Sequence, residues 1–536
     1  MIKQLKAYSL TQEQLILLTS LGLTLLYNSS MFTHIVEVYP FSGWNILYIL
    51  SIGVIQTTVT ALFFTLLASK FTTKPLLIIT LIVSSFTAYF MNNYNVLIDE
   101  NMIRNALQTN IDESLDLFNI KLLLYVILLG LLPSYMIYKV PLLYRPFRVE
   151  ILAKIKNSII LIVLTLLVVA MFGKFYTSFF REHKILRFYS NPSFWIHSTR
   201  IYITQNMENK NRIIEPIGLD AKIENNTTRK IVFMVVGEAS RADHFSLNGY
   251  QKDTNPQLGK EDIINFSQMY SCGTSTAYSV PCMFSIYNRS DYSYQKAKWK
   301  ENVLDVLNHT NKIAILWRDN NSDSKGVALR VSYEDFKSSK NNPNCDIECR
   351  DIGMLHDLDT FIAKHPNKSI LVILHQMGNH GPAYYKRYTK PFEKFEPVCK
   401  SNQFEECTEQ SIINAYDNAL LYSDNFLAKT IKLAKSYNKS ETAVLYMSDH
   451  GESLGEHGIY LHGLPYFIAP DAQKHVGSFL WLNKQYQNRL DMRQITQKSN
   501  KPLSHDYLFH TLLGLFGVKT KVYNPRLDIL QGKQSL

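Results

Sequence analysis

Residues 230–241 read KIVFMVVGEASR, and this stretch decides the fold of the larger part of the chain. Its first seven residues are an almost wholly apolar run of strand length that ends directly at Gly237 and Glu238. Similar runs occur at 312–317 (KIAILW), 369–376 (SILVILHQ) and 442–448 (TAVLYMS). Apolar runs without alternation predict strands buried on both faces. Helical patterns at 302–310 and 411–437 precede two of these runs, so we expect an α/β domain with a largely parallel central sheet.

Polar side chains follow three of these strands at the point where each strand ends. Glu238 follows the first strand, His380 lies in the loop after the third, and Asp449 and His450 follow the fourth. Ligands bind outside the carboxyl ends of the strands in such sheets. Each motif alone is also compatible with a helix cap or a hydrogen-bonded histidine in a turn. Carboxylates and imidazoles at three strand ends together favour a zinc site, with further histidines close by at His457 and His462.

A second stretch, SCGTSTAYSVPCMFS at 271–285, is rich in hydroxyl groups. A small-residue turn leads into a helical pattern that begins near Thr276. The start of a helix favours negative charge, which suits an alkoxide or a bound phosphate. Thr276 is therefore the candidate nucleophile and Ser275 its nearest rival, whereas a Ser/Thr-rich surface turn is the structural alternative.

The composition divides the 536 residues into two unlike parts. Residues before about 180 are apolar with few charges, and the remainder is mixed and polar, so the mean hydropathy of −0.08 averages two different regions. A net charge of +11 suits an anionic partner, and no arginine-rich tail or zinc-finger spacing supports nucleic acid. We expect five membrane spans, near 15–32, 44–68, 75–91, 122–138 and 158–176.

The positive charges orient these spans. Lysines and arginines concentrate before the first span, between the second and third, and between the fourth and fifth, so these segments are expected to be cytoplasmic. Five spans that begin inside place everything after residue 177 outside. We expect a transmembrane domain at 1–177, bridging helices at 178–229 and an external catalytic domain at 230–536. The external loop 92–120 reads either as an amphipathic helix on the membrane surface or as a segment that leans over the catalytic site.

All six cysteines lie in the second part and form three close pairs. Six cysteines permit 15 pairings, and we predict nearest neighbours because each pair encloses a short loop. Disulfides require an oxidising compartment, in agreement with the external placement. A zinc cluster is disfavoured because the spacings do not form CxxC pairs. The predicted bonds are Cys272–Cys282, Cys345–Cys349 and Cys399–Cys407.

Five motifs together resemble one family: VGEASR (236–241), CGTSTAYSVPC (272–282), GNHGPAYYKRY (378–388), SDHGESLG (448–455) and YLHG (460–463). They closely resemble the phosphoethanolamine transferases that modify lipid A, a group that includes the mobile colistin resistance enzymes and belongs to the alkaline phosphatase and sulfatase superfamily. The resemblance covers nearly the whole chain. It implies five spans followed by an external domain of the alkaline phosphatase type.

The resemblance also implies roles for individual residues. Thr276 is the implied nucleophile and shares a zinc ion with Glu238, Asp449 and His450, and His380 and His462 contact the phosphoryl group or a second zinc. The implied substrate-binding residues are Asn105, Thr109, Glu113, Asn321, Ser322 and Lys325. The segment Gly455–His457 departs from the family pattern, which leaves His457 without a role.

The implied reaction moves phosphoethanolamine from phosphatidylethanolamine to a phosphate of lipid A by a ping-pong route through a phospho-threonine. It would lower surface negative charge and confer polymyxin and colistin resistance. The implied setting is the bacterial inner membrane, with a monomeric multi-pass protein, a periplasmic catalytic domain, membrane lipids as partners and no nucleic acid. One tightly bound zinc is expected, with a second ion as an option.

Several alternatives remain at this stage. The acceptor could be a core sugar of lipopolysaccharide, or the group transferred could be glycerol phosphate, although paired cysteines disfavour the latter. A sulfatase would need a cysteine or serine converted to formylglycine where this chain has Thr276. A non-enzymatic transporter or receptor is disfavoured because the spans carry almost no charge.

Overall fold

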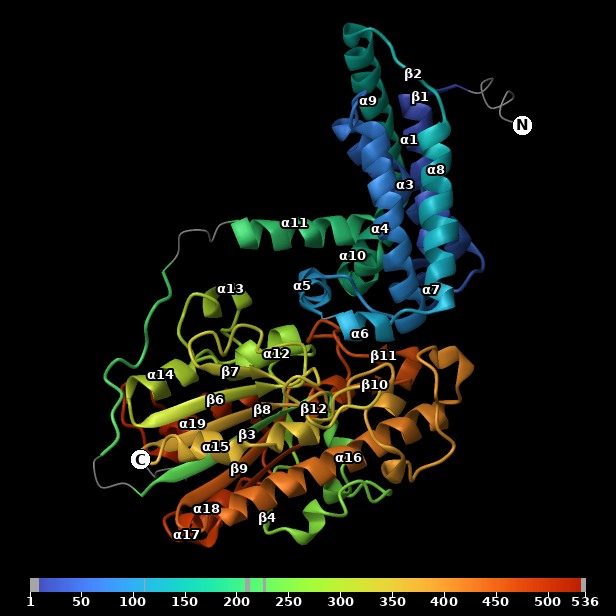
Figure 1. Ribbon diagram of the computed structural model, residues 1–536. Coiled ribbons are helices and arrows are strands. Elements are labelled where there is room, and N and C mark those ends of the chain that lie inside the picture. The colour runs from blue at the N-terminus through green and yellow to red at the C-terminus, as the bar shows by residue number, and fades with distance from the viewer. Residues whose placement is uncertain (1–8, 110, 208–212, 225–227, 532–536) are drawn as a thin grey trace. The chain divides into compact units, whose positions relative to one another are not determined.

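The computed structural model describes residues 9–109, 111–207, 213–224 and 228–531 (Figure 1). The chain divides into two compact units. One comprises Met1–Ile103 and Phe118–Thr204, and the other comprises Arg104–Leu117 and Gln205–Leu536. The short segment Arg104–Leu117, which lies inside the predicted external loop, therefore belongs by its contacts to the larger unit.

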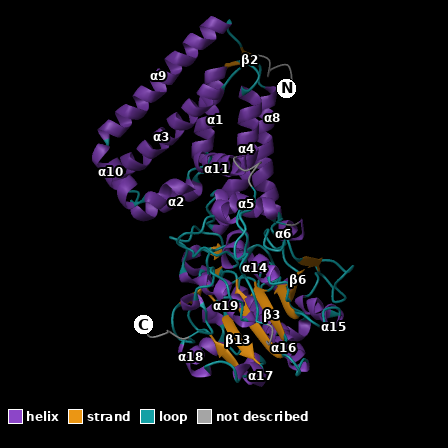
Figure 2. Ribbon diagram, turned by 90° about the vertical axis from the view of Figure 1, so that its left-hand side faces the viewer, coloured by secondary structure: helices purple, strands orange, loops and turns teal. Residues whose placement is uncertain are grey.

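The first unit is almost entirely helical (Figure 2). Within the described residues, four of its helices are long and apolar enough to cross a membrane, namely α3, α4, α9 and the continuous helix Ile120–Lys139. A fifth span results if α1 and α2, which meet at an angle of 60°, form one bent span. The bounds are α1 (Gln12–Tyr27), α2 (Ser29–Val38), α3 (Trp44–Leu67), α4 (Thr73–Tyr94), α7 (Ile120–Tyr125), α8 (Leu132–Lys139), α9 (Phe147–Met171), α10 (Gly173–Glu182) and α11 (Ser193–Met207), with the short strands β1 (Leu10–Thr11) and β2 (Leu142–Leu143).

Pro133 lies inside the fourth predicted span, and the helix accommodates it. A π-helical turn, Val126–Leu131, precedes Pro133 at the start of α8. Proline cannot donate to the carbonyl four residues earlier, which is that of Leu129. The Tyr27 hydroxyl on α1 donates to this carbonyl instead. The span therefore continues through the proline.

The larger unit is built on a seven-stranded sheet with the order β4-β13-β9-β3-β8-β6-β7 (Figure 1). The strands from β9 to β7 are parallel, and β13 is antiparallel to both of its neighbours. The prediction of a largely parallel sheet is thus confirmed, and the four predicted strands are its centre. The bounds are β4 (Ile263–Asn265), β13 (Ser478–Leu482), β9 (Glu441–Ser448), β3 (Lys230–Gly237), β8 (Ser369–His375), β6 (Ile313–Asp319) and β7 (Ser332–Asp335).

Helices cover both faces of this sheet. On one face Val232, Met234 and Val236 of β3 pack in the main core with α14 (Val303–His309) and α19 (Leu508–Phe516). Alternation along the strand directs the intervening side chains to the other face, where α16 (Glu409–Ser436) packs against β3 and β9. The remaining elements are the helices α5 (Glu100–Gln108), α6 (Ile111–Asp116), α12 (Thr276–Met283), α13 (Tyr294–Ala297), α15 (Leu358–Ala363), α17 (Lys484–Gln487) and α18 (Met492–Gln497), and the strands β5 (Met269–Tyr270), β10 (Ser453–Leu454), β11 (Tyr460–Leu461), β12 (His475–Val476) and β14 (Leu503–Ser504).

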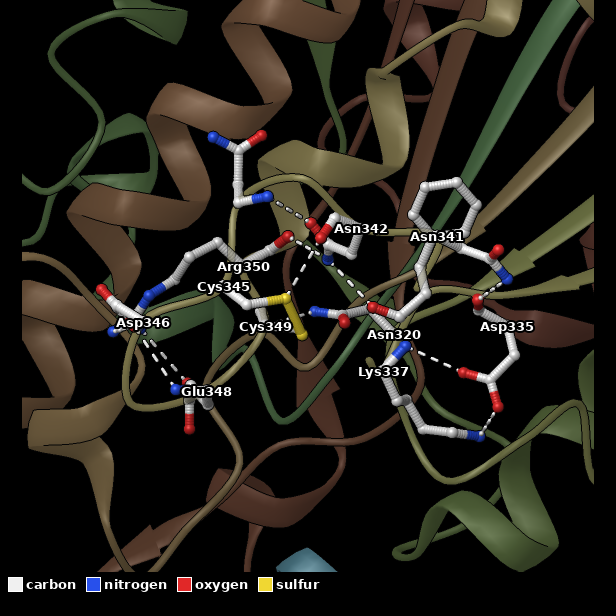
Figure 3. The surroundings of a disulfide bond; sticks show 12 residues. Asn320, Asp335, Lys337, Asn341, Asn342, Cys345, Asp346, Glu348, Cys349 and Arg350 are labelled. Atoms are coloured by element: carbon white, nitrogen blue, oxygen red, sulfur yellow. Dashed lines mark hydrogen bonds and ion pairs between the residues drawn. A yellow bond between two sulfur atoms is a disulfide. The ribbon is translucent and has the colours of Figure 1, made fainter. Parts of the chain in front are cut away.

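Three disulfides join all six cysteines as nearest neighbours, the pairs that the spacing predicted. Cys272 and Cys282 enclose the start of α12 and contribute to a small apolar cluster with Tyr292. Figure 3 shows the surroundings of Cys345–Cys349, which closes a hairpin of charged residues. Each bond therefore closes a short loop, and Cys272–Cys282 joins the turn before Thr276 to α12.

Candidate metal and nucleophile site

Thr276 is the first residue of α12, directly after Ser275, whose backbone is extended. The Thr276 hydroxyl donates to Glu238 Oε2 at 3.0 Å and lies 3.2 Å from His450 Nε2. All three side chains are buried. Residues that are far apart in the sequence thus meet around one hydroxyl group at the start of a helix.

Glu238, Asp449 and His450 form a group that could hold a metal ion. One ligand atom from each lies within 4.8 Å of the others. His450 Nε2 is 3.3 Å from Glu238 Oε1 and 3.4 Å from Asp449 Oδ2. Asp449 Oδ2 is buried and accepts no hydrogen bond among the described residues. Two buried carboxylates require a positive partner, and this set of oxygen and nitrogen donors suits zinc.

The sheet register brings these ligands together. Strands β3 and β9 are parallel neighbours in which Gly237 pairs with Ser448, so Glu238 and Asp449 follow at the same level. The Asp449 amide donates to the Gly237 carbonyl at 2.9 Å. His450 Nδ1 is 2.8 Å from the Gly451 carbonyl, which leaves Nε2 directed at the carboxylates. A hydrogen bond of this kind fixes the ring of a metal-binding histidine.

The loop after β8 passes directly over Glu238. Gly378 has a positive φ of 50°, and a Cβ atom there would lie 2.9 Å from the Glu238 carbonyl oxygen. Only glycine allows both this conformation and this approach. The same loop then carries His380 towards the site.

Asn321 and its neighbours flank the ligand group. The Asn321 amide donates to Glu238 Oε2 at 2.9 Å and to the Gln376 carbonyl at 2.7 Å, and Ser322 Oγ donates to Asn321 Oδ1 at 2.9 Å. Lys325 donates to the Gln108 carbonyl at 3.1 Å, at the end of α5. Asn321 therefore contacts a candidate metal ligand directly, while head-group binding by these residues stays a prediction.

A second group of candidate ligands adjoins the first. His450, Glu452 and His462 also have ligand atoms within 4.8 Å of one another. Glu452 Oε2 is 2.7 Å from His462 Nδ1, and Tyr384 donates to Glu452 Oε1 at 2.7 Å. The His380 ring lies 5.7 Å from that of His462. The sequence contained a signal for Glu452, a carboxylate two residues after the Asp-His pair, but we had assigned it no role.

Burial lowers the pKa of both central histidines. The pKa of His380 lies well below its usual value. Desolvation is the largest cause, and the neighbouring His462 is the next. Desolvation also lowers the pKa of His450. Neutral imidazoles are the form that binds metals and donates hydrogen bonds without adding charge.

His505 was not predicted to have any role, although it lies beneath the nucleophile helix. Its Nδ1 accepts from the Cys272 amide at 3.1 Å, and its Nε2 lies 2.9 Å from the Ser448 carbonyl. Burial lowers its pKa to about 4. A neutral ring with the proton on Nε2 satisfies both bonds. His505 thus joins the turn before Thr276 to the strand that carries Asp449.

The remaining candidates are the loop residues Asn105, Thr109 and Glu113 and the unassigned His457. The Thr109 hydroxyl donates to the Asn105 carbonyl at 2.7 Å near the end of α5. The side chain of Glu113 lies outside the described residues. His457 is exposed, has a positive φ of 55° and belongs to neither ligand group among the described residues.

This geometry defines a class of enzyme. A threonine at a helix start, two buried carboxylates and a histidine at the carboxyl edge of a mostly parallel sheet are the arrangement of the alkaline phosphatase and sulfatase type, and residues 230–518 match the sulfatase family model. Residues 57–207 match the model described as phosphoethanolamine transferase EptA/EptB. The chain belongs to the phosphoethanolamine transferase family.

Individual relatives agree with this assignment. The chain is 42% identical to phosphatidylethanolamine transferase Mcr-2 of Escherichia coli, with 98% of each chain covered. It is 37% identical to phosphoethanolamine transferase EptA of Escherichia coli K12, with 99% of each covered. Among solved structures, the integral membrane lipooligosaccharide phosphoethanolamine transferase A of Neisseria meningitidis matches with a TM-score of 0.93 and 34% identity, covering 98% of this chain and 99% of that one.

Proposed function

We propose that this protein transfers phosphoethanolamine from phosphatidylethanolamine to a phosphate group of lipid A through a phosphoester on Thr276. The observation that carries the proposal is the position of the Thr276 hydroxyl, at a helix start and within 3.2 Å of both Glu238 and His450. The donor is supported by the relative Mcr-2, which is named a phosphatidylethanolamine transferase.

In the first half-reaction, Thr276 Oγ bonds to the phosphorus of the donor lipid. The bond from phosphorus to the glycerol oxygen breaks, and diacylglycerol leaves with the proton that the threonine has lost. Zinc held by Glu238, Thr276, Asp449 and His450 would stabilise the threonine alkoxide and offset charge on the phosphoryl oxygens. His380, whose pKa is lowered by burial, and His462 are proposed to donate hydrogen bonds to those oxygens.

In the second half-reaction, an oxygen of the acceptor phosphate attacks the same phosphorus atom. The bond to Thr276 breaks, the threonine regains a proton from the acceptor, and a diphosphate linkage forms. One site thus serves two lipids in turn, which is ping-pong chemistry. Asn321, Ser322 and Lys325, together with Asn105, Thr109 and Glu113 on the loop, are proposed to bind the donor head group.

The location follows from the spans. We propose that the bent pair α1 and α2 is one span, which makes five and supports an external position for the catalytic domain. In a bacterium with lipid A this face is the periplasm, where the three disulfides can form. A single chain contains all of the proposed ligands, so a monomer suffices.

A core sugar is the second candidate acceptor. One relative, named Kdo(2)-lipid A phosphoethanolamine 7''-transferase from Escherichia coli K12, is 25% identical and covers 95% of this chain. The preference for a lipid A phosphate rests on the motif resemblance, and the lower identity of this relative, compared with 42% for Mcr-2, leaves its acceptor as the second candidate.

Mass spectrometry of lipid A and of the core from expressing cells tests the proposal. Cells with the wild-type protein should carry one added phosphoethanolamine on lipid A, and cells with Thr276→Ala should not. Modified cells should also resist polymyxins, because the added ammonium group offsets phosphate charge. Modification of the core alone would show that the acceptor is a core sugar. An unchanged mass shift of lipid A in cells with Thr276→Ala would refute the mechanism.

A further inference from the structure

A buried cluster of charges surrounds Arg387, outside the candidate metal groups. Arg387 follows a short turn in the motif GNHGPAYYKRY and is 4% exposed. Its Nε donates to the His380 carbonyl at 2.7 Å and its Nη2 donates to Asp116 at 2.6 Å, while Nη1 donates to Glu348. The planar guanidinium therefore engages three segments of the chain at once.

Asp116 brings the loop between α4 and α7 into this cluster. It is the last residue of α6, and its side chain is 10% exposed. Besides Arg387 it accepts from Lys386 at 2.5 Å, and its carbonyl accepts from Asn402 at 2.6 Å. The other end of this segment is held too, because Arg104 donates to Gln205 at 3.0 Å.

Glu348 brings a disulfide-closed hairpin into the cluster (Figure 3). It lies between Cys345 and Cys349, and Arg350 lies 3.3 Å from its carboxylate. Arg350 also pairs with Asp346 at 2.6 Å and donates to the Lys386 carbonyl. The disulfide and these bonds fix the position of the carboxylate that Arg387 contacts.

We infer that Arg387 is a positioning residue that aligns the two halves of the donor site. On one side it fixes the peptide of His380, and on the other it fixes the end of the segment that carries Asn105 and Thr109. The inference rests on the proposed function, in which His380 contacts the phosphoryl group and the loop contacts the ethanolamine. The position of the segment that ends at Asp116 and the position of His380 are then linked through the side chain of Arg387.

The linkage predicts how substitutions combine. Asp116→Asn keeps the shape of the side chain but removes its charge, so the loop should dock less tightly and the KM for phosphatidylethanolamine should rise about tenfold, with a smaller change in kcat. Arg387→Gln should lower kcat as well, because the His380 peptide is released. Arg387→Lys should not restore activity, since a lysine cannot reach three partners.

A double-mutant cycle on the full-length protein provides the test. Adding Asp116→Asn to Arg387→Gln should cause a smaller loss in kcat/KM than Asp116→Asn causes alone, because only the contact of Asp116 with Lys386 then remains to be weakened. Lys390→Gln is the control, because it removes an exposed ion pair with Glu393 close in the sequence and should leave the kinetics unchanged. Additive losses would overturn the inference.

Hydrogen–deuterium exchange supplies a readout that needs no substrate. Both Asp116→Asn and Arg387→Gln should speed amide exchange in residues 114–117, and Arg387→Gln should also speed it in residues 378–382, with bound metal retained. Arg387→Gln should also lower the Tm, because the buried Asp116 and Glu348 lose a positive partner. Unchanged exchange in both segments would overturn the inference. If the wild-type protein fails to transfer phosphoethanolamine while exchange behaves as expected, the proposed function fails and the linkage stands.

Discussion

The Thr276 hydroxyl donates to Glu238 Oε2 at 3.0 Å, although the two residues are 38 positions apart. Glu238 directly follows the central strand β3 and Thr276 begins α12, so the contact joins the carboxyl edge of the sheet to a helix start. A neighbouring carboxylate disfavours ionisation of the threonine hydroxyl, so the hydroxyl needs a compensating positive charge to become a good nucleophile. This contact supports our proposal that the two residues are ligands of one metal ion.

Substitution at Thr276 should separate the nucleophile from its neighbour. Thr276→Ala should reduce transfer from phosphatidylethanolamine by at least about 10³-fold, because the atom that bonds to phosphorus is lost. Thr276→Ser should retain measurable activity. Ser275→Ala is the matched control, since Ser275 makes no side-chain cap bond to α12. Loss of activity in Ser275→Ala with retention in Thr276→Ala would assign the reaction to Ser275.

Metal binding should depend on Glu238 and not on His457. We expect Glu238→Gln to lose most of its bound zinc and His457→Ala to keep it, as measured by elemental analysis of the purified proteins. In the wild type, zinc at 100 times its Kd should raise the free energy of unfolding by about 2.7 kcal/mol, seen as a higher Tm after chelation and reloading. Equal zinc content in both variants would contradict the assigned ligands.

His505 should make stability depend on pH. Its folded pKa of about 4 lies below the ordinary value of 6.5. The unfolded chain therefore binds the extra proton in this window, and stability that is complete above pH 6.5 falls as the pH drops towards 4, by roughly 3 kcal/mol.

The variant His505→Gln isolates this contribution. Glutamine can accept from the Cys272 amide and donate to the Ser448 carbonyl, but it does not titrate. The difference in stability between wild type and variant, measured by thermal unfolding, should shrink or reverse as the pH falls from 6.5 to 4. A difference that stays constant across this range would show that His505 titrates normally.

Loss of the disulfide Cys272–Cys282 should lower activity more than loss of another disulfide that contributes equally to stability. Replacing both cysteines with serine should cost about 2–3 kcal/mol, as expected for a loop of 10 residues. Replacing Cys399 and Cys407, which close a loop of 8, should cost a similar amount. Transfer activity should fall more in the first variant, because that bond holds the turn before Thr276. Equal effects on activity would show that the bond only stabilises the fold.

The central strands and the start of α12 could be predicted because their signals are local. Apolar runs predict buried strands whatever their surroundings. The edge strand β4 and its neighbour β13 were missed because they have only 3 and 5 residues, and their direction depends on pairing. The bend between α1 and α2 was missed as well, because hydropathy does not register that the Asn28 amide donates to the Leu23 carbonyl at 2.8 Å.

The candidate site shows the same limit. Glu238, Asp449 and His450 could be proposed because each follows a strand end. Spacing marks Glu452 as a carboxylate close to His450 but does not show its contact with His462, and it gives no reason to select His505, which contacts the distant Cys272. Prediction therefore reached the residues at strand ends and missed those that hold them in place.

The central claim is that Thr276 carries the phosphoethanolamine group between donor and acceptor. The most direct measurement is mass spectrometry of the full-length protein after incubation with phosphatidylethanolamine in the absence of acceptor. We predict an added mass of one phosphoethanolamine on the peptide that contains Thr276, and its loss when lipid A is supplied. A protein that turns over with no adduct, or with the adduct on another residue, would contradict the account.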